Sequence, residues 1–456
     1  MALRRRKLLA LANGLVASSL MAGCSSPNPP SGSPTPSTRP PTDTRSPTTH
    51  TPETPPGTVD SAIHELTYGN TAFGVHVLHQ VADGGGNQLF SPYSIATALG
   101  MTYAGAKGDT RMEMHDVLQY PFGGSRLHET IRTLHERIIP ERVSTATTTD
   151  GGERTDVPLQ VVDANALWGH EAFPWAAEYL DLVERFYGAG LHRLDFTSKP
   201  EQARETINEW VAETTRGKIT DLLPPGSITT MTRLVLTNAV YFQALWEHPF
   251  TDTEEGSFTS LEGSESTVPM MAVGEESFRY VEIDGHHLVE LPYRGGHYGF
   301  VVVLPPEGGY EAFESALTGD RLWRWLGRME PRVGTVRMPK FGFRSGFQLS
   351  DALKALGMET AFTTDADFSG MATEGAGDSL AIDEVYHQTF IDVDEKGTEA
   401  AAATAVVVDV SAVRGEDPFN ITIDQPFLFL IRERQTGAVL FLGRVVDAAA
   451  ATPDSG

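Results

Sequence analysis

Near its C-terminus the chain reads HQTFIDVDEKGTEAAAATAVVVDVSAVRGEDPFNITIDQPFLFLIRE (residues 387–433). From Thr398 onward, alternate positions are uncharged and are either small or β-branched, as expected for a strand with one buried face. These positions are Thr398, Ala400, Ala402, Thr404, Val406, Val408 and Val410. The opposite face carries two charges, Glu399 and Asp409.

The same stretch also has features of an exposed segment. Four consecutive alanines, which are poor strand formers, lead towards a polar Arg-Gly-Glu-Asp-Pro sequence. Small side chains can slide between strands without overpacking, and Gly397 can serve as a hinge because glycine tolerates unusual backbone angles. The pattern therefore predicts a segment with two states, exposed first and inserted into a sheet later.

The composition limits the classes of partner. The chain has 456 residues, 40% of them hydrophobic, and a formal net charge of -25. A charge this negative opposes binding to nucleic acid and to anionic lipid surfaces. Arginine supplies most of the positive charge, and an acidic, lysine-poor protein suits solution at high salt. Generic acidity is the alternative interpretation.

The N-terminus has the pattern of an export signal. Residues 1–23 contain a basic cluster, a short apolar stretch and small residues directly before Cys24, the only cysteine. The small residues resemble a lipobox, whose cysteine is acylated, and the paired arginines resemble a twin-arginine signal. We therefore expect an extracellular protein held to the membrane surface by lipid on Cys24. The alternative is an ordinary signal with an incidental cysteine.

Composition changes divide the chain further. Residues 24–58 contain the anchor cysteine and a Pro/Ser/Thr-rich stalk that is too polar to fold. A globular domain is expected over 59–449, followed by a flexible tail at 450–456. Helical patterns cover 59–82, 94–119 and 201–215. Strand patterns dominate the second half, among them the apolar run FLFLIRE at 427–433, and 140–157 suggests an exposed loop. This distribution favours an α+β fold.

Known catalytic motifs are missing from the sequence. It contains no Gly-x-Ser-x-Gly elbow, no His-Glu-x-x-His, no phosphate-binding loop and no dinucleotide fingerprint. The histidines follow no ligand spacing, and one cysteine excludes an intramolecular disulfide and a cysteine-based metal site. We therefore expect a protein that is not an enzyme and that has no cofactor and no metal.

Six segments in order resemble the serpin family over about residues 65–447. They are NQLFSPYSIATALGMTYAGAKGDTRMEM (87–114), INEWVAETTRGKITDLL (207–223), TRLVLTNAVYFQALWEHPF (232–250), DFSGM (367–371), DEVYHQTFIDVDEKGTEAAAAT (383–404) and DQPFLFLIRERQTGAVLFLGRV (424–445). The resemblance implies three β-sheets, about eight or nine helices and an exposed reactive-centre loop. It assigns the hinge of that loop to Glu395, Gly397, Thr398, Ala400, Ala401, Ala402 and Ala403.

The resemblance also implies where the main sheet opens. Four polar residues match positions beneath the sheet, where a hydrogen-bond network holds the strands together: Ser91, Ser94, Asn238 and His387. Trp246 matches a tryptophan at the top of the opening. One departure is Gln243-Ala244, where the family often has Lys-Gly, and we expect little effect because the change lies at a strand exit. For each polar residue, the alternative role is that of a satisfied core group.

In the implied mechanism a serine protease attacks the loop and is trapped as an acyl-ester in a covalent complex. The family places the scissile bond fourteen residues beyond Gly397, at Ser411-Ala412, which suits elastase-like or subtilisin-like enzymes. Arg414-Gly415 is the alternative bond and indicates a trypsin-like target. The inhibitor is expected to be a monomer.

Two other functions remain open at this point. A non-inhibitory serpin-fold binding protein at the cell surface is disfavoured by the small residues Ala400–Ala403, since such proteins tend to have charged or bulky hinge residues. Only the anchor and stalk favour a surface structural module. Asn420 begins a glycosylation sequon, and it is either exposed or buried in a strand.

Overall fold

The computed structural model describes residues 61–82, 85–139, 144–148, 154–158, 160–188, 190–373, 380–398 and 417–451. Within these ranges the chain forms nine α-helices and eighteen strands in three sheets. The expected α+β class is therefore confirmed. The predicted signal, Cys24 and the stalk lie outside the described residues.

The helices lie mainly in the first half of the chain. They are α1 (Ser61–Ala82), α2 (Pro92–Tyr103), α3 (Gly108–Val117), α4 (Gly124–Ile138), α5 (Ala177–Tyr187), α6 (Pro200–Thr214), α7 (Tyr310–Ala316), α8 (Gly319–Gly327) and α9 (Ser350–Ala355). The prediction of one helix over 94–119 was wrong, because Lys107 is extended and Gly108, the first residue of α3, adopts a φ of 52°. Such a left-handed angle interrupts a helix and suits glycine.

A seven-stranded sheet contains the strands that the serpin resemblance expects to separate. Its main path runs β13 (Phe341–Gln348), β14 (Val385–Val393), β15 (Gly397–Thr398), β7 (Leu234–Leu245), β5 (Ala166–His170) and β6 (Leu191–Leu194), while β4 (Gln160–Asp163) also pairs with β7. Both faces of β7 are covered. Leu236, Val240 and Phe242 belong to the main core, and Val235 and Ala239 belong to a second core under α6. Because successive side chains of β7 point to opposite faces of the sheet, this one strand contributes to both cores.

The nine-stranded sheet is built from later parts of the chain. It contains β1 (Gln88–Phe90), β18 (Val439–Val445), β17 (Phe427–Glu433), β11 (Tyr298–Leu304), β10 (His286–Pro292), β9 (Glu265–Ile283), β12 (Glu330–Pro339), β16 (Phe419–Thr422) and β8 (Asp252–Thr259). Strands β10, β11, β17 and β18 are almost completely buried. Their sequences are accordingly near-continuous apolar runs, as expected of strands covered on both faces. Asn420 lies exposed on β16.

The region expected to be a loop at 140–157 is partly ordered as a hairpin. Strand β2 (Ser144–Thr148) pairs antiparallel with β3 (Arg154–Pro158). Threonine-rich sequence favours strands, and the Asp-Gly-Gly run between the two strands is typical of a turn. The loop prediction was therefore wrong for these two segments.

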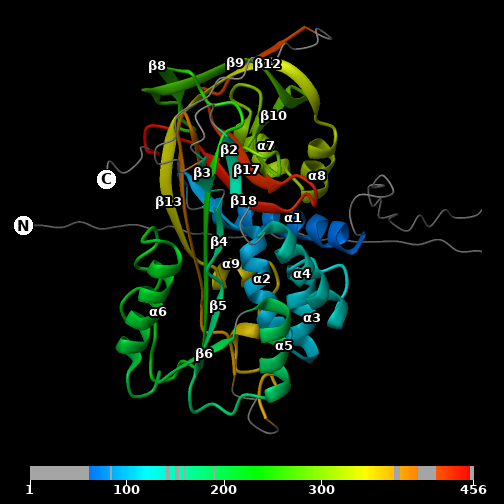
Figure 1. Ribbon diagram of the computed structural model, residues 1–456. Helices are drawn as coiled ribbons and strands as arrows, with labels where there is room; N and C mark the ends of the chain where they lie inside the picture. Colours follow the sequence, from blue (N-terminus) through cyan, green and yellow to red (C-terminus); the bar gives the residue numbers. More distant parts are fainter. Residues whose placement is uncertain are drawn as a thin grey trace, which may run out of the picture. The chain divides into compact units, whose positions relative to one another are not determined.

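Figure 1 shows α6 on one side of the seven-stranded sheet and α2–α5 on the other. Strands β8, β9 and β12 lie beyond the upper end of that sheet, near α7 and α8. The junction between β14 and β7 thus has helices on both faces of the sheet.

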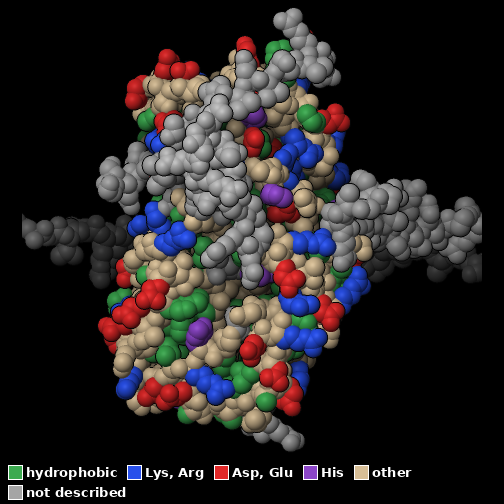
Figure 2. Space-filling view, in the orientation of Figure 1, with side chains coloured by type: hydrophobic (Ala, Val, Ile, Leu, Met, Phe, Trp, Pro, Cys, Tyr) green, Lys and Arg blue, Asp and Glu red, His purple; other side chains and the backbone are tan. Residues whose placement is uncertain are grey.

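Two further properties concern the described surface and the helices. In Figure 2, acidic and basic side chains are interspersed over the visible face rather than separated by sign. In the described part of the chain, no helix combines the length and the apolar character needed to cross a membrane.

Candidate functional site

Strand β15 lies between the upper parts of β14 and β7. Thr398 pairs with Val393 of β14 on one side and with Ala244 of β7 on the other, both antiparallel. Gly397 pairs with Leu245. Gly397 and Thr398, the described start of the predicted strand segment, therefore lie in the upper end of the sheet, and Ala244, one of the two departures from the family pattern, lies directly opposite Thr398.

Lower down, β14 and β7 pair directly with each other. Their parallel ladder runs from Val385 opposite Leu236 to Thr389 opposite Val240. Within the described residues, this ladder ends at Thr389 and Val240, four residues before the Val393 and Ala244 positions that pair with β15. The two strands are thus closed at the lower end and separated at the upper end.

A tight turn delivers the hinge to this position. The backbone N–H of Asp394 donates to the carbonyl of Gly397 at 3.0 Å, and the Asp394 carboxylate accepts from the backbone N–H groups of Lys396 and Gly397 at 2.8 and 3.0 Å. Glu395 accepts from Lys340 Nζ at 3.1 Å and from the Thr253 hydroxyl at 2.9 Å. The turn is thereby tied to neighbouring strands.

The reason given for glycine at position 397 needs correction. Gly397 does not adopt a left-handed φ. A Cβ at this position would instead meet the Ala244 carbonyl oxygen at 2.1 Å and Leu245 Cα at 2.8 Å. Close backbone approach within the sheet, rather than an unusual angle, therefore requires glycine here.

Trp246 contacts the turn at the upper junction, which is the place where β15 lies between β14 and β7. Its indole Nε1 donates to the Asp394 carbonyl at 2.9 Å, and its backbone N–H donates to the Lys396 carbonyl at 2.8 Å. The ring stacks on Tyr293 with centroids 4.5 Å apart. The Tyr293 hydroxyl in turn lies 2.5 Å from Thr398 Oγ1. One buried aromatic pair thus contacts both ends of the hinge turn.

The four polar residues predicted beneath the sheet come together at the lower junction, which is the place where β14 and β7 pair directly. His387 of β14 donates from Nδ1 to Asn238 Oδ1 of β7, and the Ser91 N–H at the start of α2 donates to His387 Nε2 at 3.0 Å. Asn238 Nδ2 donates to Ser94 Oγ at 2.7 Å and to Asn165 Oδ1 at 2.5 Å. A helix and two strands are therefore joined by buried side chains.

This network needs a neutral histidine. Since the Ser91 N–H occupies Nε2 as an acceptor, the single ring proton sits on Nδ1 and points at Asn238. Burial lowers the pKa of His387 to about 3, although hydrogen bonding to the backbone of Asn238 opposes the shift. At neutral pH the network is uncharged, and Ser91, Ser94, Asn238 and His387 are fully buried, so their polar groups need these partners.

Several contact residues were not found from the sequence. Four such residues make contacts in the site: Asn165, Tyr293, Asp394 and Lys340. Of these, only Asp394 is next to the predicted hinge in the sequence. Tyr293 contacts Thr398 across 105 residues, and no local pattern encodes such a distance. The other predicted hinge and cleavage residues lie outside the described residues: Ala400, Ala401, Ala402, Ala403, Ser411, Ala412, Arg414 and Gly415.

Among the described ranges, no group of three or more His, Cys, Asp or Glu side chains is placed to hold a metal ion. The main feature of the site is instead the short strand β15, which lies between the upper ends of the long strands β14 and β7.

Comparisons with known proteins agree with this architecture. The family model described as serpin (serine protease inhibitor) matches residues 68–448. The chain is 37% identical to an uncharacterized serpin-like protein of Thermococcus kodakarensis, over 82% of this chain and 84% of that one. It is 34% identical to the leukocyte elastase inhibitor of Bos taurus, over 84% of this chain and 99% of that one.

A solved structure has the same fold. The crystal structure of a serpin described as highly specific, from the insect Tenebrio molitor, matches with a TM-score of 0.71 and 30% identity, covering 84% of this chain and 98% of that one. The expected fold, including three sheets and nine described helices, is therefore confirmed. On these grounds the chain belongs to the serpin family.

Proposed function

We propose that this protein inhibits serine proteases as a single-use substrate. The protease serine oxygen attacks the carbonyl carbon of Ser411, the Ser411-Ala412 amide bond breaks, and the amine leaves on Ala412. The new N-terminal part of the loop, held by an ester, inserts as a central strand between β14 and β7. This movement displaces the protease and distorts its catalytic site before the ester is hydrolysed.

The position of β15 is the observation that carries the proposal. Thr398 has separate antiparallel registers with β14 and with β7. Continued down the sheet, both registers bring Thr404 to the same point, between His387 and Asn238, and these two residues already face each other in the β14–β7 ladder. A full inserted strand would therefore satisfy both neighbours without any shift of register.

The buried network sets the barrier to insertion in this proposal. Thr404 would enter where His387 now bonds to Asn238, so this bond has to break. A threonine hydroxyl can both donate and accept, and it can replace part of what each partner loses. Thr398 and Thr404 would lie on the same face of the inserted strand, and the side chain of Thr398 is already buried, with 1% of its surface exposed.

The length of β7 favours cleavage at Ser411. In the same register Val408 would lie opposite Leu234, the first residue of β7, so Ser411 would lie just past the end of the strand. A bond at Arg414 would leave a longer tether and give the protease more freedom to escape. We therefore propose an elastase-like or subtilisin-like target, with a trypsin-like enzyme as the second choice.

The location of the protein is part of the same proposal. The signal-like residues 1–23, the cysteine at position 24 and the stalk to residue 58 would hold a monomeric inhibitor outside the cell, on the membrane surface. The lipid on Cys24 would be a second partner besides the protease. Globomycin-sensitive processing and labelling with a radioactive fatty acid would test this.

The first experiment incubates the protein with subtilisin, elastase and trypsin. We expect a protease complex that survives denaturing electrophoresis, together with a released C-terminal fragment that begins at Ala412 by mass spectrometry. A fragment that begins at Gly415 would change the target class to trypsin-like enzymes. Simple cleavage that leaves all three proteases active, at low and at high salt, would contradict inhibition of these enzymes and favour a binding protein.

A further inference from the structure

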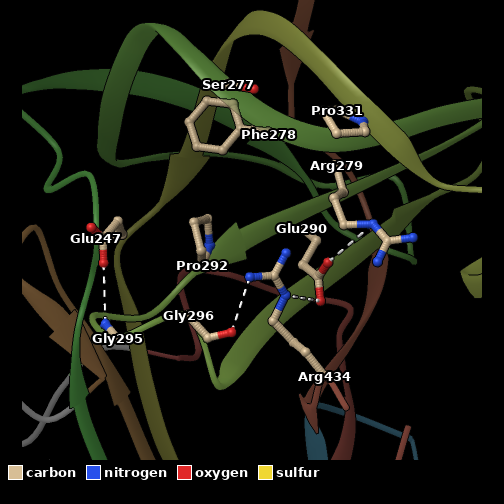
Figure 3. Close-up of a pocket in the computed structure, with 10 residues that line it drawn as sticks. All are labelled: Glu247, Ser277, Phe278, Arg279, Glu290, Pro292, Gly295, Gly296, Pro331 and Arg434. Atoms are coloured by element: carbon tan, nitrogen blue, oxygen red, sulfur yellow. Dashed lines mark hydrogen bonds and ion pairs between the residues drawn. The ribbon is translucent and has the colours of Figure 1, made fainter. Parts of the chain in front are cut away.

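A cavity of about 480 Å³ lies next to the upper junction, in the range of roughly 300–1,000 Å³ typical of small-molecule sites. Figure 3 shows the residues that line it: Glu247, Ser277, Phe278, Arg279, Glu290, Pro292, Gly295, Gly296, Pro331 and Arg434. Two of them, Glu247 and Pro292, are the sequence neighbours of Trp246 and Tyr293. The cavity is separate from the gap into which the loop would insert.

The wall of the cavity contains a buried carboxylate surrounded by guanidinium groups. Glu290 is 1% exposed, and its Oε1 accepts from Arg432 Nε at 2.9 Å. Arg434 Nε lies 3.6 Å from the same oxygen, and Arg279 Nε lies 3.8 Å from Oε2. Burial alone would raise the pKa of Glu290, but the three guanidinium groups lower it. The carboxylate is therefore ionised at neutral pH.

Two polar atoms in this cluster have no hydrogen bond. Glu290 Oε2 and Arg434 Nε are both buried and unpartnered among the described residues. Arg279 donates to the Met329 carbonyl, and Arg434 Nη1 donates to the Gly296 carbonyl at 3.1 Å, so neither arginine supplies the missing bond. Leaving such atoms unpaired is costly. A molecule in the cavity that both accepts and donates would satisfy them.

The local charge also favours an anion. Three arginines face the Glu290 carboxylate, a formal excess of two positive charges, and Glu247 on the cavity wall reduces this excess to one. Glu433 does not offset it within the cavity, since its carboxylate accepts from Gln435 and Thr436 in the adjoining turn. Glu247, on the other side, accepts from the Gly295 N–H at 3.2 Å (Figure 3). Two arginines, Arg279 and Arg434, remain partly exposed to a ligand.

We propose that this cavity binds a short dicarboxylic acid that also carries a hydroxyl or ammonium donor. The carboxylates would pair with Arg279 and Arg434, and the donor would reach Glu290 Oε2. Because the chain has a net charge of -25, non-specific attraction of anions is not expected, so binding would have to come from this cluster. The inference does not depend on the proposed inhibition of proteases.

Three four-carbon acids that share one skeleton provide the test. L-malate has a hydroxyl, L-aspartate has an ammonium group, and succinate has neither. Titration calorimetry of the full chain at low salt should show one saturable site for malate or aspartate, with at least tenfold weaker binding of succinate. The preference between malate and aspartate identifies the donor.

Three variants locate the site. Arg434→Gln should weaken binding at least tenfold, and Ser277→Trp, which narrows the cavity without changing its charge, should abolish it. Arg324→Gln is the matched control, because this arginine pairs with Asp320 on the exposed side of α8. Any of three results would overturn the proposal. The first is no saturable binding of malate or aspartate, and the second is succinate binding as tightly as both. The third is unchanged affinity in folded Arg434→Gln and Ser277→Trp proteins.

Discussion

The two ends of the β14–β7 interface are built from different interactions. At the lower end, side chains hold the strands together through a buried chain of hydrogen bonds centred on His387 and Asn238. At the upper end, backbone pairing seats Gly397 and Thr398 between the same two strands. In the proposed mechanism, the pairing of Gly397 and Thr398 marks the start of insertion, and the polar lower junction is the barrier to its continuation.

The energetic character of the two ends also differs. Each intact buried hydrogen bond contributes only about 1 kcal/mol net, but an orphaned buried partner costs about 1–3 kcal/mol. The upper end depends instead on close packing, since the main chain at Gly397 touches the main chain of β7. Changes at the upper end should therefore act by adding atoms or charge that the packed site cannot accommodate, and changes at the lower end by leaving buried polar groups unsatisfied.

The largest effect is expected from Thr398→Arg. The side chain at this position is 1% exposed, and an arginine there would bury an unpaired charge between two strands. The hinge should leave the sheet and insertion should fail, so that the protein becomes a substrate. We expect the yield of stable protease complex, measured by denaturing electrophoresis, to fall at least about a hundredfold.

The matched control for this change is Thr422→Arg, which makes the same substitution at an exposed position of β16. It should leave the complex yield within about twofold. If Thr398→Arg still forms the complex at the original rate, the upper junction has no part in inhibition.

The second largest effect is expected at the lower junction. His387→Ala orphans the Ser91 N–H and Asn238 Oδ1 and leaves a cavity, so the free energy of unfolding should fall by about 2–4 kcal/mol. Inhibitory activity should also decay faster on mild warming, because the sheet opens without cleavage. Urea unfolding and timed activity assays measure both. His297→Ala, at an exposed position, should do neither, and a loss below about 0.5 kcal/mol in His387→Ala would argue against a closing role for the network.

Gly397→Ala tests the steric account of the upper junction. Its Cβ would approach backbone atoms of Ala244 and Leu245 too closely, so we expect a cost of about 1–3 kcal/mol and a shift in Trp246 fluorescence as the turn moves away. Gly346→Ala is the control, since its nearest neighbour would be the Gln388 side chain at 3.9 Å. Equal stability of the two variants would contradict the close-approach argument.

The smallest effect is a dependence on pH. Burial lowers the pKa of His387 to about 3, below the value of about 6.5 for an unfolded histidine. Above pH 6.5 both states are neutral and nothing is lost. As pH falls below 6.5 only the unfolded state gains the proton, so stability should drop by up to about 1.4 kcal/mol per pH unit.

Unfolding in urea at pH 7, 6 and 5 measures this slope. In His387→Gln the slope between pH 6 and 5 should be shallower by about 1.4 kcal/mol per unit, while the contribution of His128, whose pKa is also lowered by burial, remains. An identical slope in the variant would show that His387 is not buried in its neutral form.

Local patterns predicted some elements well and others poorly. The apolar run Phe427–Glu433 was identified as a strand with the bounds that β17 has, because a fully buried strand is encoded by consecutive residues. The break between α2 and α3 was missed, since one left-handed glycine among helix-forming residues leaves no periodic signal. The four polar residues of the lower junction were identified by family resemblance rather than by their local sequence.

By itself, the sequence determined the α+β class, the strand-like face that begins at Thr398 and the resemblance to serpins, since these depend on residue order and short-range periodicity. Only the tertiary structure decided that Thr398 is already seated between β14 and β7, that Tyr293 and Asn165 complete the two junctions, and that three arginines surround Glu290. The physical reason is that these contacts join residues far apart in the chain. Their geometry depends on how the sheets pack, and no local spacing specifies it.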